Sequence, residues 1–186
     1  MSIRDFTKSS SLLLDVLSTF TSTELTTYEN IVLFAAISGA VALSRVDAKT
    51  KLIEAPEVLE VLPSDEKYAD VFALITSLHT REYAVFFKSL SDVEQNHLRT
   101  NRYLAQHTRW YVREMRRKAY AQILESYSSM SLKNMARAFN VTPEFLDRDL
   151  SQFIPNKQLN CVIDRVKGEY HSYKNGKYLL ILQRCC

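Results

Sequence analysis

The sequence predicts a mainly α-helical protein in which a stack of helices leads into a helix-turn-helix and a small β-structure. Only three glycines and four prolines interrupt the 186 residues, which favours helices over many short strands. The composition changes after Pro155, where β-branched residues begin to alternate with polar ones. We therefore expect two parts, a helical-repeat stack over residues 1–98 and a second module over residues 99–186.

Apolar residues at helical spacing predict six helices before the helix-turn-helix. We expect them at residues 3–20, 27–44, 56–62, 65–80, 82–97 and 101–127. In the last helix, one apolar face is formed by Leu104, Val112, Met115, Ala119 and Ile123. Short polar links between successive helices favour antiparallel pairs stacked in the manner of tetratricopeptide repeats, although no strict repeat period occurs.

The segment SLKNMARAFNVTPEFLDRDLSQFI predicts a helix-turn-helix. Ser131 can cap a helix that runs to Phe139, and Asn140 tolerates the left-handed backbone that ends it. Thr142 and Pro143 then form a start signal, because a capping hydroxyl precedes a proline at the first helical position. We expect the second helix to pack inward through Leu146, Leu150, Phe153 and Ile154.

Two strands are expected after the helix-turn-helix. Residues 159–166 alternate and are β-branched, residues 177–183 are a second candidate, and Asn175-Gly176 is a strong hairpin turn between them. Three helices followed by a two-stranded ribbon is the order of a winged-helix module. In the first strand, Leu159, Cys161 and Ile163 face the opposite side from Val162. The edge of this strand is therefore a candidate for pairing with a strand of a neighbouring protein.

The second helix of the motif is poorly suited to DNA. Its first turns carry Glu144, Asp147 and Asp149 against a single arginine, Arg148. A recognition helix presents these turns to phosphates and base edges, so carboxylates there repel the polyanion. This pattern favours a structural or protein-binding module over one that reads nucleic acid.

A basic stripe precedes the motif. Four arginines recur beside the apolar face of the predicted helix 101–127, at Arg109, Arg113, Arg116 and Arg117. Tyr103, Trp110 and Tyr111 lie between or beside them. Arginine with aromatic residues is typical of phosphate binding, but also of protein interfaces, so we favour an acidic protein partner and retain a nucleic-acid-binding winged helix as the alternative.

The sequence shows no motif for catalysis, a cofactor or a metal. The four histidines are scattered, and no glycine-rich phosphate loop, H-E-x-x-H or G-x-S-x-G occurs. The three cysteines, Cys161, Cys185 and Cys186, lack zinc spacing and predict a reducing compartment. The longest apolar run, residues 31–43, is too short to span a bilayer, and the net charge of +3 is too small to indicate nucleic acid by itself. We expect a non-enzymatic intracellular protein with no cofactor and no membrane partner.

The stretches YVREMRRKAYAQ and FIPNKQLNCVIDRV resemble the PCI domain (proteasome, signalosome, initiation factor), and among PCI proteins they are more similar to a proteasome-lid subunit than to its signalosome counterpart. The resemblance covers roughly residues 1–166. It implies a non-catalytic scaffold, cytoplasmic and nuclear, that joins neighbouring PCI subunits through winged-helix edges and supports ubiquitin-dependent degradation. The segment after Val166 departs from the family ending, and the free strand edge leads us to expect self-association in concentrated solution.

Overall fold

The computed structural model describes residues 4–20, 26–127, 129–156, 158–159, 161–164 and 169–172. Its contacts divide the chain into two compact units, residues 1–119 and 120–186. The division falls inside a long helix, α7 (Thr108–Ser126). The boundary expected between residues 98 and 99 stays a prediction.

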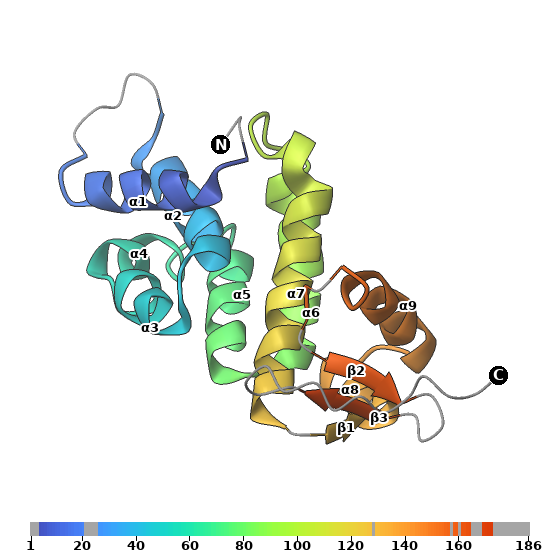
Figure 1. The fold of residues 1–186 in the computed structure, drawn as a ribbon. Coiled ribbons are helices and arrows are strands. Elements are labelled where there is room, and N and C mark those ends of the chain that lie inside the picture. Colours follow the sequence, from blue (N-terminus) through green and yellow to red (C-terminus); the bar gives the residue numbers. More distant parts are fainter. Residues whose placement is uncertain are drawn as a thin grey trace. The chain divides into compact units, whose positions relative to one another are not determined.

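The first unit is built from helix pairs (Figure 1). α1 (Phe6–Leu17) packs along α2 (Tyr28–Ala42), and α5 (Ala69–Thr80) packs along α6 (Tyr83–Val93). Between α2 and α5 lie the short helices α3 (Arg45–Ala48) and α4 (Pro56–Val61), joined by a π-helical turn, Lys49–Ile53. α2 is apolar on nearly every side and is buried along most of its length, as its sequence predicts.

Three of the predicted helices begin or end at least four residues away from the predicted position. The helix predicted from residue 65 begins at Ala69, and the helix predicted to residue 97 ends at Val93 and continues as a π-helical turn, Glu94–Leu98. The long helix begins at Thr108 instead of residue 101. The Asn101 side chain accepts a hydrogen bond from the Tyr103 amide at 2.9 Å, so residues 101–104 form a turn that competes with the helix.

The second unit contains the predicted helix-turn-helix, α8 (Leu132–Phe139) and α9 (Pro143–Phe153). Its capping signals are confirmed. Ser131 accepts from the Asn134 amide, Asn140 has a left-handed φ of 53°, and Thr142 accepts from the Phe145 amide. The turn residues therefore act as the sequence predicts.

The core of the second unit forms around Tyr120. Its ring meets Phe139 and Phe153 edge-on, with centroids 5.1 Å and 6.1 Å away. Leu146, Leu150 and Phe153 are fully buried, which confirms that α9 packs inward, whereas Ile154 is half-buried.

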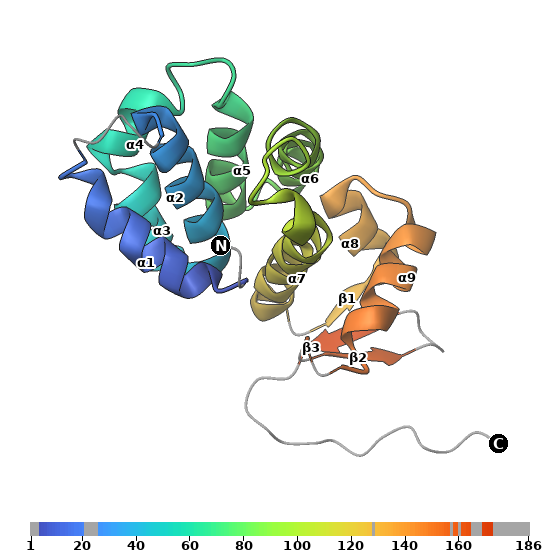
Figure 2. The same cartoon turned by 90° about the horizontal axis from the view of Figure 1, so that it is seen from above.

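In the part of the chain that the structure describes, the β-structure has three strands, where two were expected. The strands are β1 (Ser129–Ser131), β2 (Cys161–Asp164) and β3 (Glu169–Ser172), in the antiparallel order β1-β3-β2 (Figure 2). The first predicted strand is confirmed in its central part, β2, but its partner is β3 and not the predicted strand 177–183. That strand and the Asn175-Gly176 turn lie outside the described residues.

Candidate functional site

The edge of β2 is the first candidate surface. β2 pairs with β3 through the register Cys161↔Ser172 to Asp164↔Glu169, and among the described residues it has no second partner strand. Because β3 lies between β1 and β2, the outer side of β2 carries backbone N–H and C=O groups directed away from the sheet. This geometry gives a four-residue edge that another strand can extend.

The residues predicted to bind at this edge are placed only in part. Val162 lies opposite His171 and Ile163 lies opposite Tyr170 in the ladder. Leu159, just before β2, is buried, with 4% of its surface exposed. Leu159 therefore anchors the start of the strand and is not itself available to a partner. Cys161, Val162 and Ile163 stay predicted contact residues, through their backbone.

The arginine stripe is the second candidate surface, and its four members differ in exposure. Arg109 is exposed, whereas Arg113, Arg116 and Arg117 are half-buried. Arg117 forms an ion pair with Glu114 one turn earlier, with its Nε 2.7 Å from the carboxylate. Of the four predicted residues, Arg109 is therefore the most accessible to a partner.

The acidic turn of α9 is smaller than the sequence predicts. Glu144 and Asp147 are exposed, but Asp149 is buried, with 7% exposure. Tyr120 donates a hydrogen bond to the Asp149 carboxylate at 2.8 Å. Asp149 is therefore a core residue. The sequence-based expectation that it faces an approaching polyanion is wrong. Two carboxylates still flank the exposed side of the helix.

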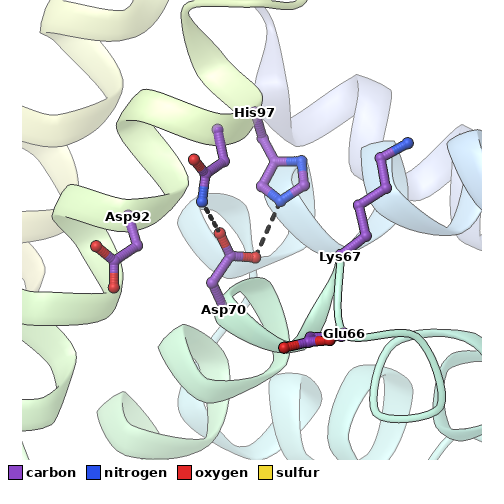
Figure 3. A pocket seen from close by; sticks show the side chains of 6 residues that line it. Glu66, Lys67, Asp70, Asp92 and His97 are labelled. Atoms are coloured by element: carbon purple, nitrogen blue, oxygen red, sulfur yellow. Dashed lines mark hydrogen bonds and ion pairs between the residues drawn. The ribbon is translucent and has the colours of Figure 1, made fainter.

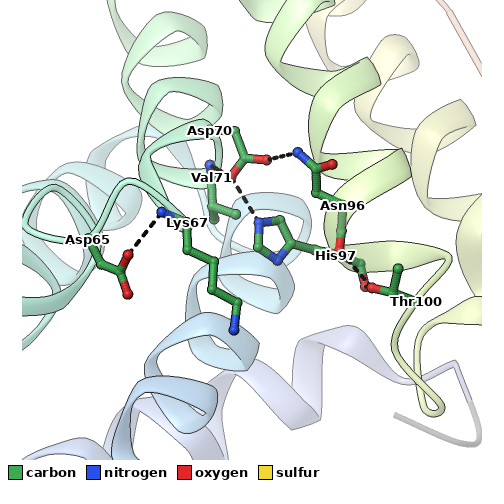
Figure 4. A network of polar contacts seen from close by, with 7 residues as sticks. All are labelled: Asp65, Lys67, Asp70, Val71, Asn96, His97 and Thr100. Atoms are coloured by element: carbon green, nitrogen blue, oxygen red, sulfur yellow. Dashed lines mark hydrogen bonds and ion pairs between the residues drawn. The ribbon is translucent and has the colours of Figure 1, made fainter.

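Sequence reasoning missed a polar network in the first unit. Asp70, in the first turn of α5, accepts hydrogen bonds from the Val71 amide at 2.8 Å and from the Asn96 side chain at 3.1 Å (Figure 4). His97 Nε2 lies 2.9 Å from the same carboxylate, and the His97 ring stacks on Tyr68. Burial raises the pKa of Asp70, but the hydrogen bonds from His97 and Asn96 outweigh burial and hold the pKa below its ordinary value.

This network lies at an open hollow of about 280 Å³ (Figure 3). The hollow is lined by Glu66, Lys67, Asp70, Asp92, Asn96 and His97. Both oxygens of Asp70 are already engaged by partners within the chain, so the carboxylate joins α5 to the π-helical turn after α6. The arrangement is that of a structural clamp. No signal in the sequence indicated it, because Asp70 and His97 are 27 positions apart.

Within the ranges that the structure describes, no group of three or more His, Cys, Asp or Glu side chains is arranged to hold a metal ion. None of the helices that the structure describes combines the length and apolar character needed to cross a bilayer.

Comparison with known proteins places the chain in a family. Residues 80–170 match the PCI domain, and residues 1–51 match the family described as 26S proteasome subunit RPN7. The chain belongs to the PCI-domain family. The PCI match includes α6, α7, the helix-turn-helix and all of β2, so both candidate surfaces lie within it.

Relatives of this PCI protein carry proteasome names. The chain is 54% identical over 168 residues to the 26S proteasome regulatory subunit rpn7 of Schizosaccharomyces pombe, covering 90% of this chain and 42% of the relative. It is 45% identical to the 26S proteasome regulatory subunit RPN7 of Saccharomyces cerevisiae, and 39% identical to the 26S proteasome non-ATPase regulatory subunit 6 of Dictyostelium discoideum. These two matches cover 99% of this chain and 44% and 48% of the relatives. The chain thus spans less than half the length of each.

Proposed function

We propose that this chain is a non-catalytic scaffold subunit of the proteasome regulatory-particle lid. The similarity to proteins named as 26S proteasome regulatory subunits supports membership of the chain in the proteasome. The match to the PCI domain supports a role in assembly. In this proposal the chain works in the cytoplasm and nucleus and contributes to ubiquitin-dependent degradation by holding other subunits in place.

The helical pairs and the second unit have separate roles in this proposal. Residues 1–98 form a TPR-like arm, and α8, α9 and the small sheet form a winged helix. The observation that carries the assembly role is the outer edge of β2, which has no partner strand in the described part of the chain. Neighbouring PCI subunits add a strand there, because main-chain hydrogen bonds give affinity without a dedicated side-chain pocket. The same edge allows self-association at high concentration.

The alternatives are a nucleic-acid-binding winged helix and the equivalent signalosome subunit. The exposed carboxylates of Glu144 and Asp147 on α9 argue against nucleic-acid binding, because they would repel phosphates. The proteasome names of the relatives argue against a signalosome subunit.

Proline substitution tests strand addition. Successive backbone N–H groups in a strand point to opposite edges, so Val162→Pro and Ile163→Pro form a matched pair. Each proline removes the backbone N–H at its own position. At one of the two positions this N–H faces outward toward a partner strand, and at the other it faces β3. We expect the outward-facing variant to lose capture by purified PCI subunits of the lid while its helical circular dichroism signal is retained. Normal capture by both folded variants would contradict the role of this edge and make the helical arm the leading surface.

A further inference from the structure

The open hollow at the Asp70 network, hereafter the Asp70 hollow, contains carboxylates that the chain leaves unpaired. Asp92 on α6 is half-buried, Glu66 just before α5 is exposed, and both line the hollow. Within the described residues, neither carboxylate forms an ion pair or a hydrogen bond. In Figure 3 only Asp70 has partners, Asn96 and His97. The hollow therefore offers acceptors to a molecule from outside.

His97 adds a further acceptor to this hollow. Its side chain is only 5% exposed, and its Nε2 lies 2.9 Å from the Asp70 carboxylate. The neutral ring therefore carries its proton on Nε2, which leaves Nδ1 as an acceptor. Nδ1 has no hydrogen-bond partner among the described residues, and in Figure 3 it points to the side of the hollow on which Lys67 lies. A buried ring with an unpaired acceptor indicates a ligand that donates hydrogen bonds.

The charge of the Asp70 hollow is negative. Among the described residues that line it, Lys67 is the one lysine or arginine, against three carboxylates. The Lys67 ammonium lies 5.1 Å from the centroid of the Tyr68 ring, and no described carboxylate forms an ion pair with it. The hollow therefore favours a cationic ligand.

A second open hollow, of about 340 Å³, adjoins the first along the chain. This Tyr28 hollow is lined by Tyr28, Glu29, Glu60, Val61, Ser64 and Asp65. The segment Ser64–Lys67 contributes two residues to each hollow, and four consecutive residues span at most about 11 Å. None of the three carboxylates of the Tyr28 hollow forms an ion pair within the described part of the chain. Burial and the carboxylates of Glu57 and Glu60 raise the pKa of Tyr28, as expected for a hydroxyl in negative surroundings.

We propose that the two hollows together bind a basic segment of a partner protein, with one arginine side chain in each hollow. A guanidinium group has a permanent positive charge and five N–H donors, which match the carboxylates and the Nδ1 atom of the Asp70 hollow. In the Tyr28 hollow, the half-buried ring adds a face on which a guanidinium group stacks. An extended segment rises about 3.3 Å per residue, so arginines about three residues apart reach both hollows. This inference rests on the proposed scaffold function, but it uses the first unit and not the β2 edge.

The test uses the full chain and labelled peptides of glycine and serine that carry one arginine or two arginines three residues apart. Binding is followed by fluorescence anisotropy. The two-arginine peptide should bind at least about fivefold more tightly than the one-arginine peptide. Replacing both arginines with lysine should weaken binding, because an ammonium lacks the planar array of donors.

Two double variants locate the binding surface, after circular dichroism has shown that both are folded. Glu66→Gln/Asp92→Asn should weaken binding of the two-arginine peptide at least about fivefold and remove most of its advantage over the one-arginine peptide. The matched control is Glu82→Gln/Glu125→Gln, which changes the net charge equally at two exposed carboxylates that line neither hollow. It should leave affinity within about twofold.

Three outcomes would overturn the proposal. Equal weakening by the control variant would reduce the effect to net charge, and unchanged binding by Glu66→Gln/Asp92→Asn would exclude the Asp70 hollow. Equal affinity for the one-arginine and two-arginine peptides would exclude joint use of the two hollows. Capture through the β2 edge is measured separately with the proline pair, so failure of either surface leaves the other interpretable.

Discussion

The ammonium group of Lys118 lies 2.7 Å from the carbonyl oxygen of Leu43, to which it donates a hydrogen bond across 75 positions of sequence. The same group donates to the carbonyls of Ala40 and Val41, at 2.7 Å and 3.3 Å. These carbonyls are at the end of α2, where a helix lacks its own donors and carries partial negative charge. A lysine of α7 therefore caps the end of α2.

Replacing Lys118 with methionine should destabilise the protein by roughly 1.5–3 kcal/mol, because charged hydrogen bonds are lost and partly buried carbonyls lose their donor. Equilibrium unfolding in urea measures this. Lys88→Met, at an exposed lysine of α6, is the matched control and should change the free energy of unfolding by less than about 0.5 kcal/mol.

The cost of Lys118→Met should also depend on pH. Burial and the neighbouring Arg117 lower the pKa of Lys118 to about 8. Between pH about 8 and pH 10.5, the unfolded chain binds more protons at Lys118 than the folded chain does. The contribution of Lys118 to stability therefore rises with pH across this range. The variant should lose more stability relative to wild type at pH about 9.5 than at pH about 7. An equal loss at both values would contradict the lowered pKa.

Tyr120→Phe should destabilise the second unit by roughly 1–3 kcal/mol, because the buried Asp149 carboxylate loses the 2.8 Å hydrogen bond from the Tyr120 hydroxyl. Urea unfolding monitors the loss. The exposed Tyr127 is a matched position, and Tyr127→Phe should be nearly neutral. If the two substitutions had equal effects, the hydrogen bond would contribute nothing to stability.

Leu150→Ala should cost roughly 2–5 kcal/mol, since the fully buried side chain would leave a cavity between α9 and its neighbours. Leu59→Ala, at a leucine that is 42% exposed on α4, should cost clearly less. Chemical denaturation of both variants provides the comparison, and an unfolding midpoint for Leu150→Ala that matches wild type would refute the inward packing of α9.

Asp70→Asn should make the protein less stable at neutral pH and less sensitive to acid. The pKa of Asp70 is lowered in the folded state, so its contribution is present above the unfolded pKa of about 4 and is lost as the pH falls through the lower folded value. Thermal unfolding at several pH values should therefore show wild type and variant converging in acid. A constant difference down to pH about 2.5 would exclude this linkage.

Binding to duplex DNA should be weak and independent of sequence. The exposed carboxylates of Glu144 and Asp147 flank the helix that would have to enter the groove. At physiological salt, titration of labelled duplexes should give dissociation constants no tighter than about 10⁻⁴ to 10⁻⁶ M. Nanomolar, sequence-dependent binding would favour the nucleic-acid alternative.

Local signals in the sequence determined much of the second unit. Ser131, Asn140 and Thr142 act within three or four residues of their own positions, so the ends of α8 and α9 could be predicted without knowing the tertiary structure. The inward face of α9 was equally predictable, because Leu146, Leu150 and Phe153 recur at helical spacing.

Other features depend on partners that are distant in the sequence. β1 is a three-residue strand without β-branched residues, and it forms only because β3, about 40 positions later, supplies its hydrogen bonds. From the sequence, Asp149 is expected to be a surface carboxylate. In the folded chain it is buried and accepts a hydrogen bond from Tyr120. The clamp of Asp70 with His97 and the cap of α2 by Lys118 likewise join separate helices. Residue spacing predicts which face of a helix is buried, but the polar partner that a buried group meets is decided only when the helices pack together.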